Sequence, residues 1–141
     1  MNSLDVGTST LTGTALINTT GDITNSGPIT VQLTTMVDSH GGNIALTQAQ
    51  NDFVGAVTII SNALDINDTT HLLIESFTST QVNTTADDGV TLINFINAAA
   101  GTIRVQANVD STGNDDLLML PDSTIVTTND TALAVMLEIN S

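Results

Sequence analysis

The sequence predicts an all-β protein built as a β-solenoid, a parallel β-helix with coils of about 20–24 residues. Three observations lead to this fold. The chain has 25 Thr and 14 Asn, whereas the charged helix formers Glu, Lys and Arg together number three. Thr favours strands, and Asn favours turns. Apolar residues come in pairs two positions apart, and this pattern returns after 20-odd residues.

The apolar pairs are clearest in residues 43–74, where turn-forming Asn, Asp and Gly separate them. Because side chains alternate between the two sides of a strand, both members of each pair face the same way. The pattern therefore predicts short, half-buried strands separated by tight polar turns. We expect ten side chains to face one continuous interior: Ile44, Leu46, Val57, Ile59, Leu64, Ile66, Val90, Leu92, Ile103 and Val105.

About thirteen short strands are predicted along the chain. Residues 4–24 alternate apolar and small polar residues, with glycines as breaks, and residues 29–37 read as one strand bent near Thr34-Thr35. Composition predicts turns at 25–28, 38–43 and 110–116. Beyond the central pairs, strands are expected at 81–83, 90–96, 102–109, 117–120, 123–128 and 134–139.

The spacing between equivalent apolar residues favours a solenoid over a β-sandwich, which remains the alternative. Ile23 to Ile44 is 21 residues, Ile44 to Ile66 is 22, Ile66 to Val90 is 24, and Ile103 to Ile125 is 22. Such a repeat, holding two or three short strands, has the length of one coil. Strands this short suit a coil better than a sandwich. We expect residues 1–141 to form a single solenoid domain.

The amino-acid sequence of the repeats resembles that of filamentous-haemagglutinin-like exoproteins and autotransporter passengers of Gram-negative bacteria. The resemblance covers most of residues 15–140. It rests on GGNIALTQ (41–48), the Asn51-Asp52-Phe53-x-Gly55-x-Val57 run, ALDINDTTHLLI (63–74), GTIRVQANVDSTGNDDLLML (101–120) and STIVTTNDTALAVMLEI (123–139). It implies a right-handed parallel β-helix, exported to the cell surface or beyond it, with a role in adhesion or biofilm structure.

The charge of the chain excludes several classes of partner. Arg104 is the only strong base against 15 acids, which gives a net charge of −14. Nucleic acids and anionic membranes attract proteins through Lys and Arg, so neither is an expected partner. No apolar run is long enough to insert into a membrane as a helix, and MNSLDVGTST has no signal-peptide pattern. We therefore expect a fragment of a longer protein, whose export signal lies elsewhere.

No catalytic arrangement emerges from the sequence, and we do not expect an enzyme. His40 lies in a turn near Asp38, and His71 follows Asp68 by three residues. Neither pattern supplies the nucleophile, base and oxyanion site that acyl transfer requires. Polysaccharide-cleaving β-helices need positive charge and aromatic platforms. The chain has one Arg, and its three Phe (Phe53, Phe77 and Phe95) are expected in the core.

The one candidate cofactor is Ca²⁺. Asp110, Asn114, Asp115 and Asp116 place hard oxygen ligands around a glycine, as calcium loops do. The run does not match the EF-hand pattern or the calcium-binding nonapeptide repeat. The alternative is a solvated loop whose side chains cap the backbone.

Two functions are compatible with these features. The first is a non-catalytic segment of a large surface adhesin, which acts as an extended stalk and presents loops. The second is a subunit that assembles end to end into an extracellular filament through unpaired strand edges. The expected partners are neighbouring repeats of the same protein, copies of the chain, and a surface ligand that the sequence does not identify.

Overall fold

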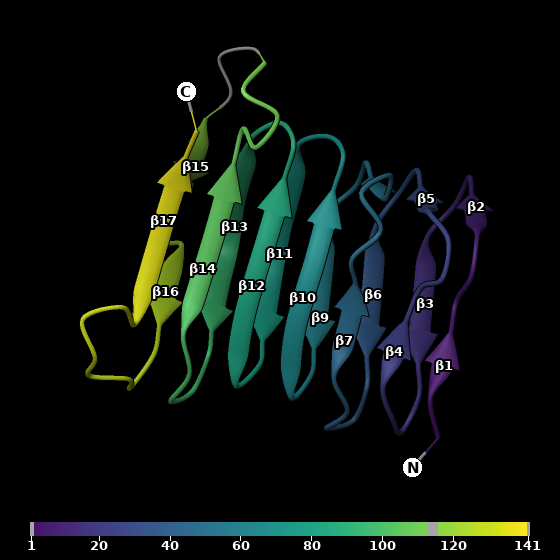
Figure 1. Cartoon of the computed structure of the whole chain (residues 1–141), viewed down its shortest axis with the longest axis horizontal. Helices are drawn as coiled ribbons and strands as arrows, with labels where there is room; N and C mark the ends of the chain where they lie inside the picture. Colours follow the sequence, from purple (N-terminus) through teal and green to yellow (C-terminus); the bar gives the residue numbers. More distant parts are fainter. Residues whose placement is uncertain (1, 113–115, 141) are drawn as a thin grey trace.

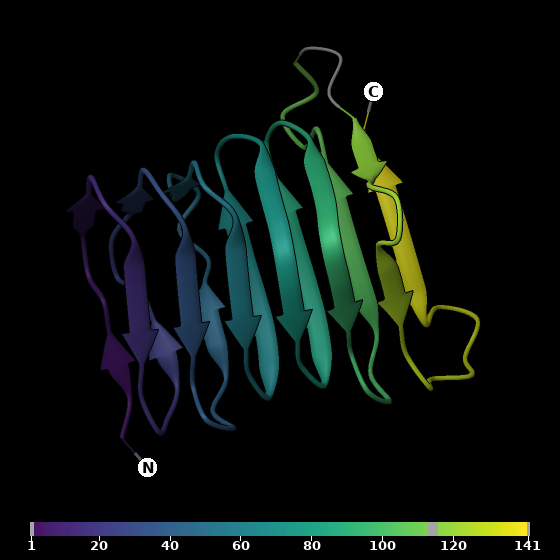
Figure 2. The same cartoon turned by 180° about the vertical axis from the view of Figure 1, so that it is seen from behind.

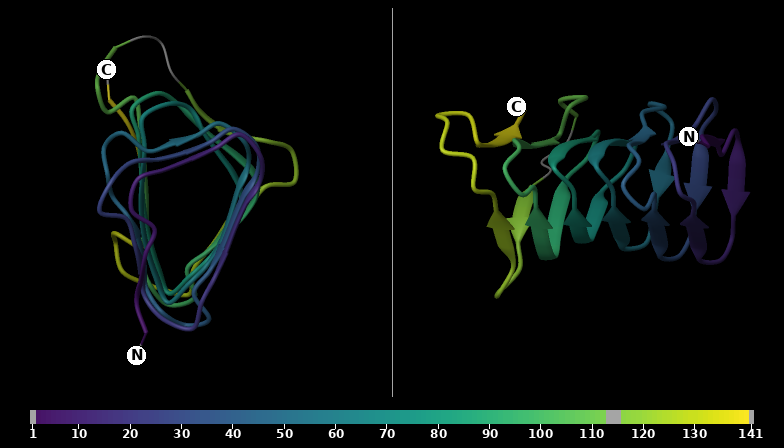
Figure 3. Two further views of the ribbon diagram at one scale, coloured as in Figure 1. Left: turned by 90° about the vertical axis from the view of Figure 1, so that its right-hand side faces the viewer. Right: turned by 90° about the horizontal axis from the view of Figure 1, so that it is seen from below.

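The chain winds as a right-handed β-solenoid of about five regular turns followed by one longer turn. The structure is a computed structural model that describes residues 2–112 and 116–140, and these contain strands and no helix. In Figure 1 the chain rises along the near side, crosses over, descends along the far side and advances from right to left. The view along the axis shows a roughly triangular outline (Figure 3). The prediction of an all-β, right-handed parallel solenoid is confirmed.

Three parallel sheets form the sides of the coil, and each is named here by its first strand. The β1 sheet contains β1 (Leu4–Asp5), β4 (Ile23–Thr24), β7 (Ile44–Leu46), β10 (Ala63–Asp68), β12 (Gln81–Ala86), β14 (Ile103–Ala107) and β17 (Val135–Ile139). The β3 sheet contains β3 (Ala15–Asn18), β6 (Thr35–Asp38), β9 (Val57–Ile60), β11 (Leu72–Thr78), β13 (Val90–Asn97), β15 (Leu117–Met119) and β16 (Thr124–Val126). The β2 sheet contains β2 (Ser9–Leu11), β5 (Ile29–Val31) and β8 (Asp52–Phe53).

The turns of the solenoid differ in length more than the sequence suggested. Aligned residues of the β1 sheet are 19, 21, 20, 18 and 21 positions apart in the first five turns, and 32 apart in the last. Ile23 does align with Ile44. The other expected pairings are wrong, because Ile66 aligns with Leu46 and Thr84, and Ile125 pairs with Ile96 in the other sheet.

Two long strands, β11 (Leu72–Thr78) and β13 (Val90–Asn97), replace the separate strands of the earlier turns, and β11 lies in the shortest turn. In the first three turns a β2-sheet strand and a β3-sheet strand are separate, with a break of three residues between them. β11 and β13 instead run through the corner as single strands, bent where the register shifts between Ile74 and Ser76. In the last turn the same path divides again into β15 and β16, which both pair with β13.

The predicted interior is confirmed residue by residue. All ten side chains expected to face inward are buried, and they belong to one core cluster that follows the axis of the coil. Phe53 and Phe77 are fully buried in it as expected. The placement of Phe95 in the core is wrong. Its neighbour Ile96 takes the inward position, so Phe95 lies half-buried on the outside of β13.

Strand boundaries were the weaker part of the prediction. The described residues hold seventeen strands, not thirteen. Residues 29–37 are not one bent strand, because β5 and β6 belong to different sheets and are separated by a corner. The strand expected at 81–83 extends to Ala86, since its alternation of buried Val82, Thr84 and Ala86 continues through polar residues.

Candidate functional site

A buried row of polar side chains lines one corner of the coil, after the strands of the β1 sheet. Asn25 and Asn51 follow β4 and β7, and their side chains are almost fully buried. The Asn25 amide donates to Asn51 Oδ1 at 2.7 Å, and the Asn51 amide donates to the Leu46 carbonyl at 2.8 Å. Asn51 Oδ1 also accepts the Ile29 N–H at 3.0 Å. The row satisfies backbone groups that the corner would otherwise leave unpaired, so its role is structural.

Asp68 continues this row in the next turn, where a carboxyl replaces the amide. Its Oδ1 accepts the Thr70 N–H at 3.1 Å and the more distant Phe53 N–H at 3.4 Å. Its Oδ2 is buried and has no hydrogen-bond partner. Burial raises the pKa of Asp68 to about 6, with a smaller contribution from the charge of Asp52. The sequence pattern assigned Asn51 and Asp68 to polar turns, and no signal in it distinguished these buried residues from exposed ones.

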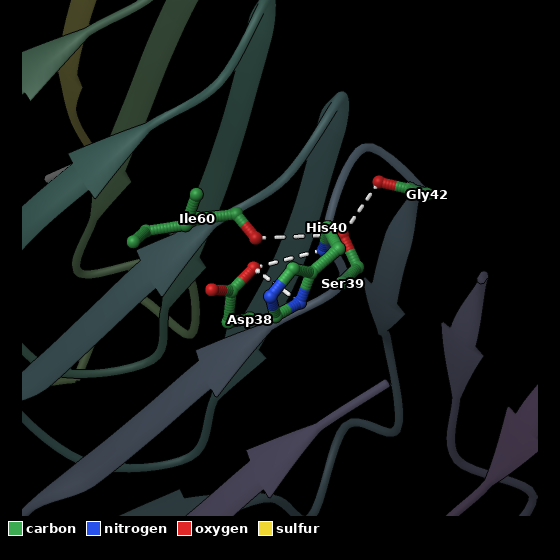
Figure 4. A network of polar contacts seen from close by, with 5 residues as sticks. All are labelled: Asp38, Ser39, His40, Gly42 and Ile60. Carbon is green, nitrogen blue, oxygen red and sulfur yellow. Dashed lines mark hydrogen bonds and ion pairs between the residues drawn. The ribbon is translucent and has the colours of Figure 1, made fainter. Parts of the chain in front are cut away.

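The Asp38-Ser39-His40 run forms a tight turn (Figure 4). His40 adopts a left-handed backbone with φ of 46°, and its N–H donates to Asp38 Oδ1 at 2.8 Å. The His40 ring Nδ1 lies 3.3 Å from the same oxygen. The Ser39 hydroxyl is buried and donates to the Gly42 carbonyl at 2.7 Å, so it points away from the histidine ring. The expected turn at this position is confirmed.

The second histidine contacts a threonine of the following turn. His71 Nε2 lies 2.8 Å from Thr91 Oγ1, and the two residues stand on neighbouring turns. Gly89 packs against the His71 ring so closely that an added Cβ would lie 2.7 Å from Nδ1. The ring is therefore held in place by packing and one hydrogen bond.

The structure describes only part of the predicted calcium loop. Asn114 and Asp115 lie outside the described residues. Asp110 is exposed, and its two carboxyl oxygens accept the Thr112 N–H at 2.9 Å and the Thr112 hydroxyl at 2.6 Å. Both hydrogen bonds lower the pKa of Asp110, and the bond from the Thr112 hydroxyl has the larger effect. Asp116 is exposed at the far end of the same loop. Within residues 2–112 and 116–140, no group of three or more His, Asp or Glu is placed to hold a metal.

The outer face of the β1 sheet carries a shallow groove of about 460 Å³, lined by both polar and apolar residues. Within the groove Asn83 donates to Asp65 at 2.8 Å, and Arg104 donates at 2.9 Å to Glu138, which lies beside the groove on the adjacent strand. Gln106 donates to the same Glu138 oxygen at 2.8 Å. Arg104 is thus neutralised by an acid on the adjacent strand, which leaves little positive charge to attract an anionic ligand.

Comparison with known proteins supports the repeat character of the chain. Residues 1–60 match a family described as Repeats of unknown function (DUF5649). This stretch is a little under half of the chain and ends with β9, so it holds the three turns in which all three sides have separate strands. No curated protein and no solved structure matches the chain. No helix in the described residues has the length and apolarity needed to cross a membrane.

Proposed function

We propose that this β-solenoid is a non-catalytic segment of a large bacterial surface protein, in which it acts as an extended spacer and presents loops. One observation carries the proposal: both ends of the coil expose side chains that belong to the core. Solenoid coils are stabilised mainly by their nearest neighbours, so an end with an uncovered core is suited to continue into another coil.

The exposed core positions follow from strand register. Leu4 aligns with Ile23, and Leu11 aligns with Val31, yet Leu4 and Leu11 are 39% and 38% exposed whereas their partners are fully buried. At the other end, three inward-facing residues of β17 are exposed: Val135, Leu137 and Ile139. Each end also has outer strands with one unpaired edge among the described residues. A further coil of similar sequence would cover these side chains and pair these edges.

The loops between β14 and β15 and between β16 and β17 are the elements suited to presentation. They make the last turn 32 residues long. The loop between β16 and β17 extends beyond the triangular outline of the coil (Figure 3). Loops on a rigid scaffold commonly carry binding functions. The ligand in this proposal is a molecule of the host or matrix surface, and the location is the exterior of a Gram-negative cell. Surface proteolysis of intact cells that produce the protein tests the location.

A tandem protein tests the end surfaces. Two copies joined tail to head through a short Gly/Ser linker should be more stable than a single copy by about 3 kcal/mol, since the junction buries several half-exposed apolar side chains. The same tandem with Leu137→Asp in its first copy should lose this gain. Equal stability of the tandem and the single copy in urea would contradict the proposal.

The same ends favour a second candidate, a filament formed by separate copies. Each copy carries a net charge of −14, so end-to-end association must overcome repulsion. We expect no end-to-end association in low salt. Longer assemblies should form in high salt or near the isoelectric point, where the repulsion is screened or removed. Light scattering across these conditions distinguishes the candidates, because fibres at low salt without divalent cations would favour the filament.

A further inference from the structure

Two carboxyl groups from neighbouring turns meet at one threonine hydroxyl, at the corner that follows the strands of the β1 sheet. Asp68 ends β10, and Thr70 follows it in the connection to β11, whereas Asp52 belongs to β8 in the preceding turn. Thr70 Oγ1 lies 3.1 Å from Asp52 Oδ1 and 3.3 Å from Asp68 Oδ1. We call Asp52, Asp68 and Thr70 the corner cluster. The corner forms the upper edge of the coil in Figure 2.

The corner cluster has more hydrogen-bond acceptors than donors. The Thr70 hydroxyl has one proton, so it can donate to only one of the two carboxylates that it contacts. The N–H groups of Thr70 and Phe53 both donate to Asp68 Oδ1. Asp68 Oδ2 has no hydrogen-bond partner, although the residue is almost fully buried. A buried carboxylate oxygen without a donor is costly, so the corner cluster favours the entry of a positive charge.

No basic side chain supplies that charge. Arg104 is the only Lys or Arg of the chain, and it is paired with Glu138 on the outer face of the β1 sheet. The His71 ring contacts Thr91 in the following turn. A third acid, Asp87, accepts a hydrogen bond from the neighbouring Thr69 hydroxyl. Since no three acids of the described residues converge as a metal-binding group, Asp87 adds negative charge near the corner cluster but no ligand.

We propose that the corner cluster binds one Ca²⁺ ion through the carboxylates of Asp52 and Asp68 and the Thr70 hydroxyl. Oxygens that share a Ca²⁺ ion at about 2.4 Å lie roughly 3 Å from one another. The contacts of 3.1 and 3.3 Å between Thr70 Oγ1 and the two carboxylate oxygens already have this spacing. The ion would also supply the missing partner of Asp68 Oδ2.

The chemistry of the ligands favours Ca²⁺ over other common cations. Two carboxylates require two positive charges, which Na⁺ does not carry. Mg²⁺ demands near-ideal octahedral geometry, whereas Ca²⁺ accepts irregular sets of carboxylate, neutral oxygen and water ligands. Asp52 and Thr70 are only half-buried, so water can fill the remaining positions from the solvent side.

The small number of protein ligands predicts weak binding. We expect a dissociation constant of about 1 mM, in the range of extracellular calcium modules. Mass action at about 10 mM CaCl₂ should then raise the melting temperature by about 4 °C. The inference concerns the isolated protein and does not depend on the proposed function. The corner cluster is also separate from the loop between Asp110 and Asp116.

Thermal unfolding at pH 7.5 in 0.15 M NaCl, with about 10 mM CaCl₂ or MgCl₂, tests the inference. Calcium should raise the melting temperature of the natural protein more than magnesium does, and Asp68→Asn or Asp52→Asn should abolish this difference. Asp87→Asn removes the same charge from the same corner and should keep the difference. The double variant Asp110→Asn, Asp116→Asn should keep it as well, because the loop after β14 does not contribute.

Nuclear magnetic resonance locates the ion. The N–H groups of Phe53 and Thr70, which donate to Asp68, should shift on titration with CaCl₂ and reach half of their final shift at about 1 mM. The Thr112 N–H, which donates to Asp110, reports on the other loop. Equal effects of calcium and magnesium, or a calcium response that persists in Asp68→Asn, would overturn the inference. Shifts that do not saturate, or that are confined to Thr112, would overturn it as well.

Discussion

Replacing Asp68 with Asn should stabilise the protein at neutral pH and leave its stability almost unchanged in acid. Asp68 is 2% exposed, and one of its carboxyl oxygens has no hydrogen-bond partner. Burial raises the pKa of this carboxyl from its usual 3.8 to about 6. At pH 7.5 the folded protein must therefore hold a charge in a site that favours the neutral acid. Asn is neutral, has nearly the same shape, and can keep the oxygen that accepts the Thr70 N–H.

The magnitude and the pH range follow from linkage. The folded state binds the proton of Asp68 more tightly than the unfolded chain does. The contribution of Asp68 to the free energy of unfolding is therefore most favourable below about pH 4. It falls as the pH rises through 6 and stays constant above that. The difference between 3.8 and about 6 corresponds to about 3 kcal/mol, because a tenfold change in proton affinity is worth about 1.4 kcal/mol.

Urea unfolding of both proteins at several pH values between 4 and 8 measures this difference. The gain of Asp68→Asn over the natural protein should be near zero at pH 4 and about 3 kcal/mol at pH 7.5. Asp130→Asn removes the same charge from an exposed site and should show at most a small, weakly pH-dependent gain. A gain for Asp68→Asn that is absent, or that is equal at pH 4 and pH 7.5, would refute the reasoning.

Three further predictions concern the core, the polar corner and the loop after β14. Ile59→Asp should abolish folding, because burying an unpaired carboxylate costs about as much free energy as the whole free energy of unfolding. Ile60 faces outward, so Ile60→Asp should fold, and circular dichroism compares the two variants. Asn51→Ala should lower the free energy of unfolding, measured in urea, by about 2–4 kcal/mol, because it leaves several buried groups unpaired. The amide of Asn67 makes one exposed hydrogen bond, so the control Asn67→Ala should lower it by less than about 1 kcal/mol. Calcium should raise the melting temperature by a few degrees at most through mass action. If calorimetric titration with calcium gives no binding heat and a chelator leaves the melting temperature unchanged, then the loop from Asp110 to Asp116 does not bind calcium.

The sequence by itself determined which side of each strand faces inward. A pair such as Ile44 and Leu46 must share one side, whichever strand lies next to it, because alternation is a property of the extended backbone. The ten core positions were therefore predictable without knowledge of the neighbours. The same reasoning predicted short strands, polar corners and a coil instead of a sandwich.

Only the tertiary structure decided which turns stack in which register. Register depends on how many residues each corner uses, and the corners differ: β11 passes through one as a bent strand, whereas β5 and β6 are separated there. A 22-residue spacing thus linked Ile103 to Ile125, although these residues lie on different sides of the coil. The burial of Asn51 and Asp68 was not predictable either. An Asn or Asp near a strand end has the same local pattern whether its side chain turns outward to water or inward to the backbone of the preceding coil.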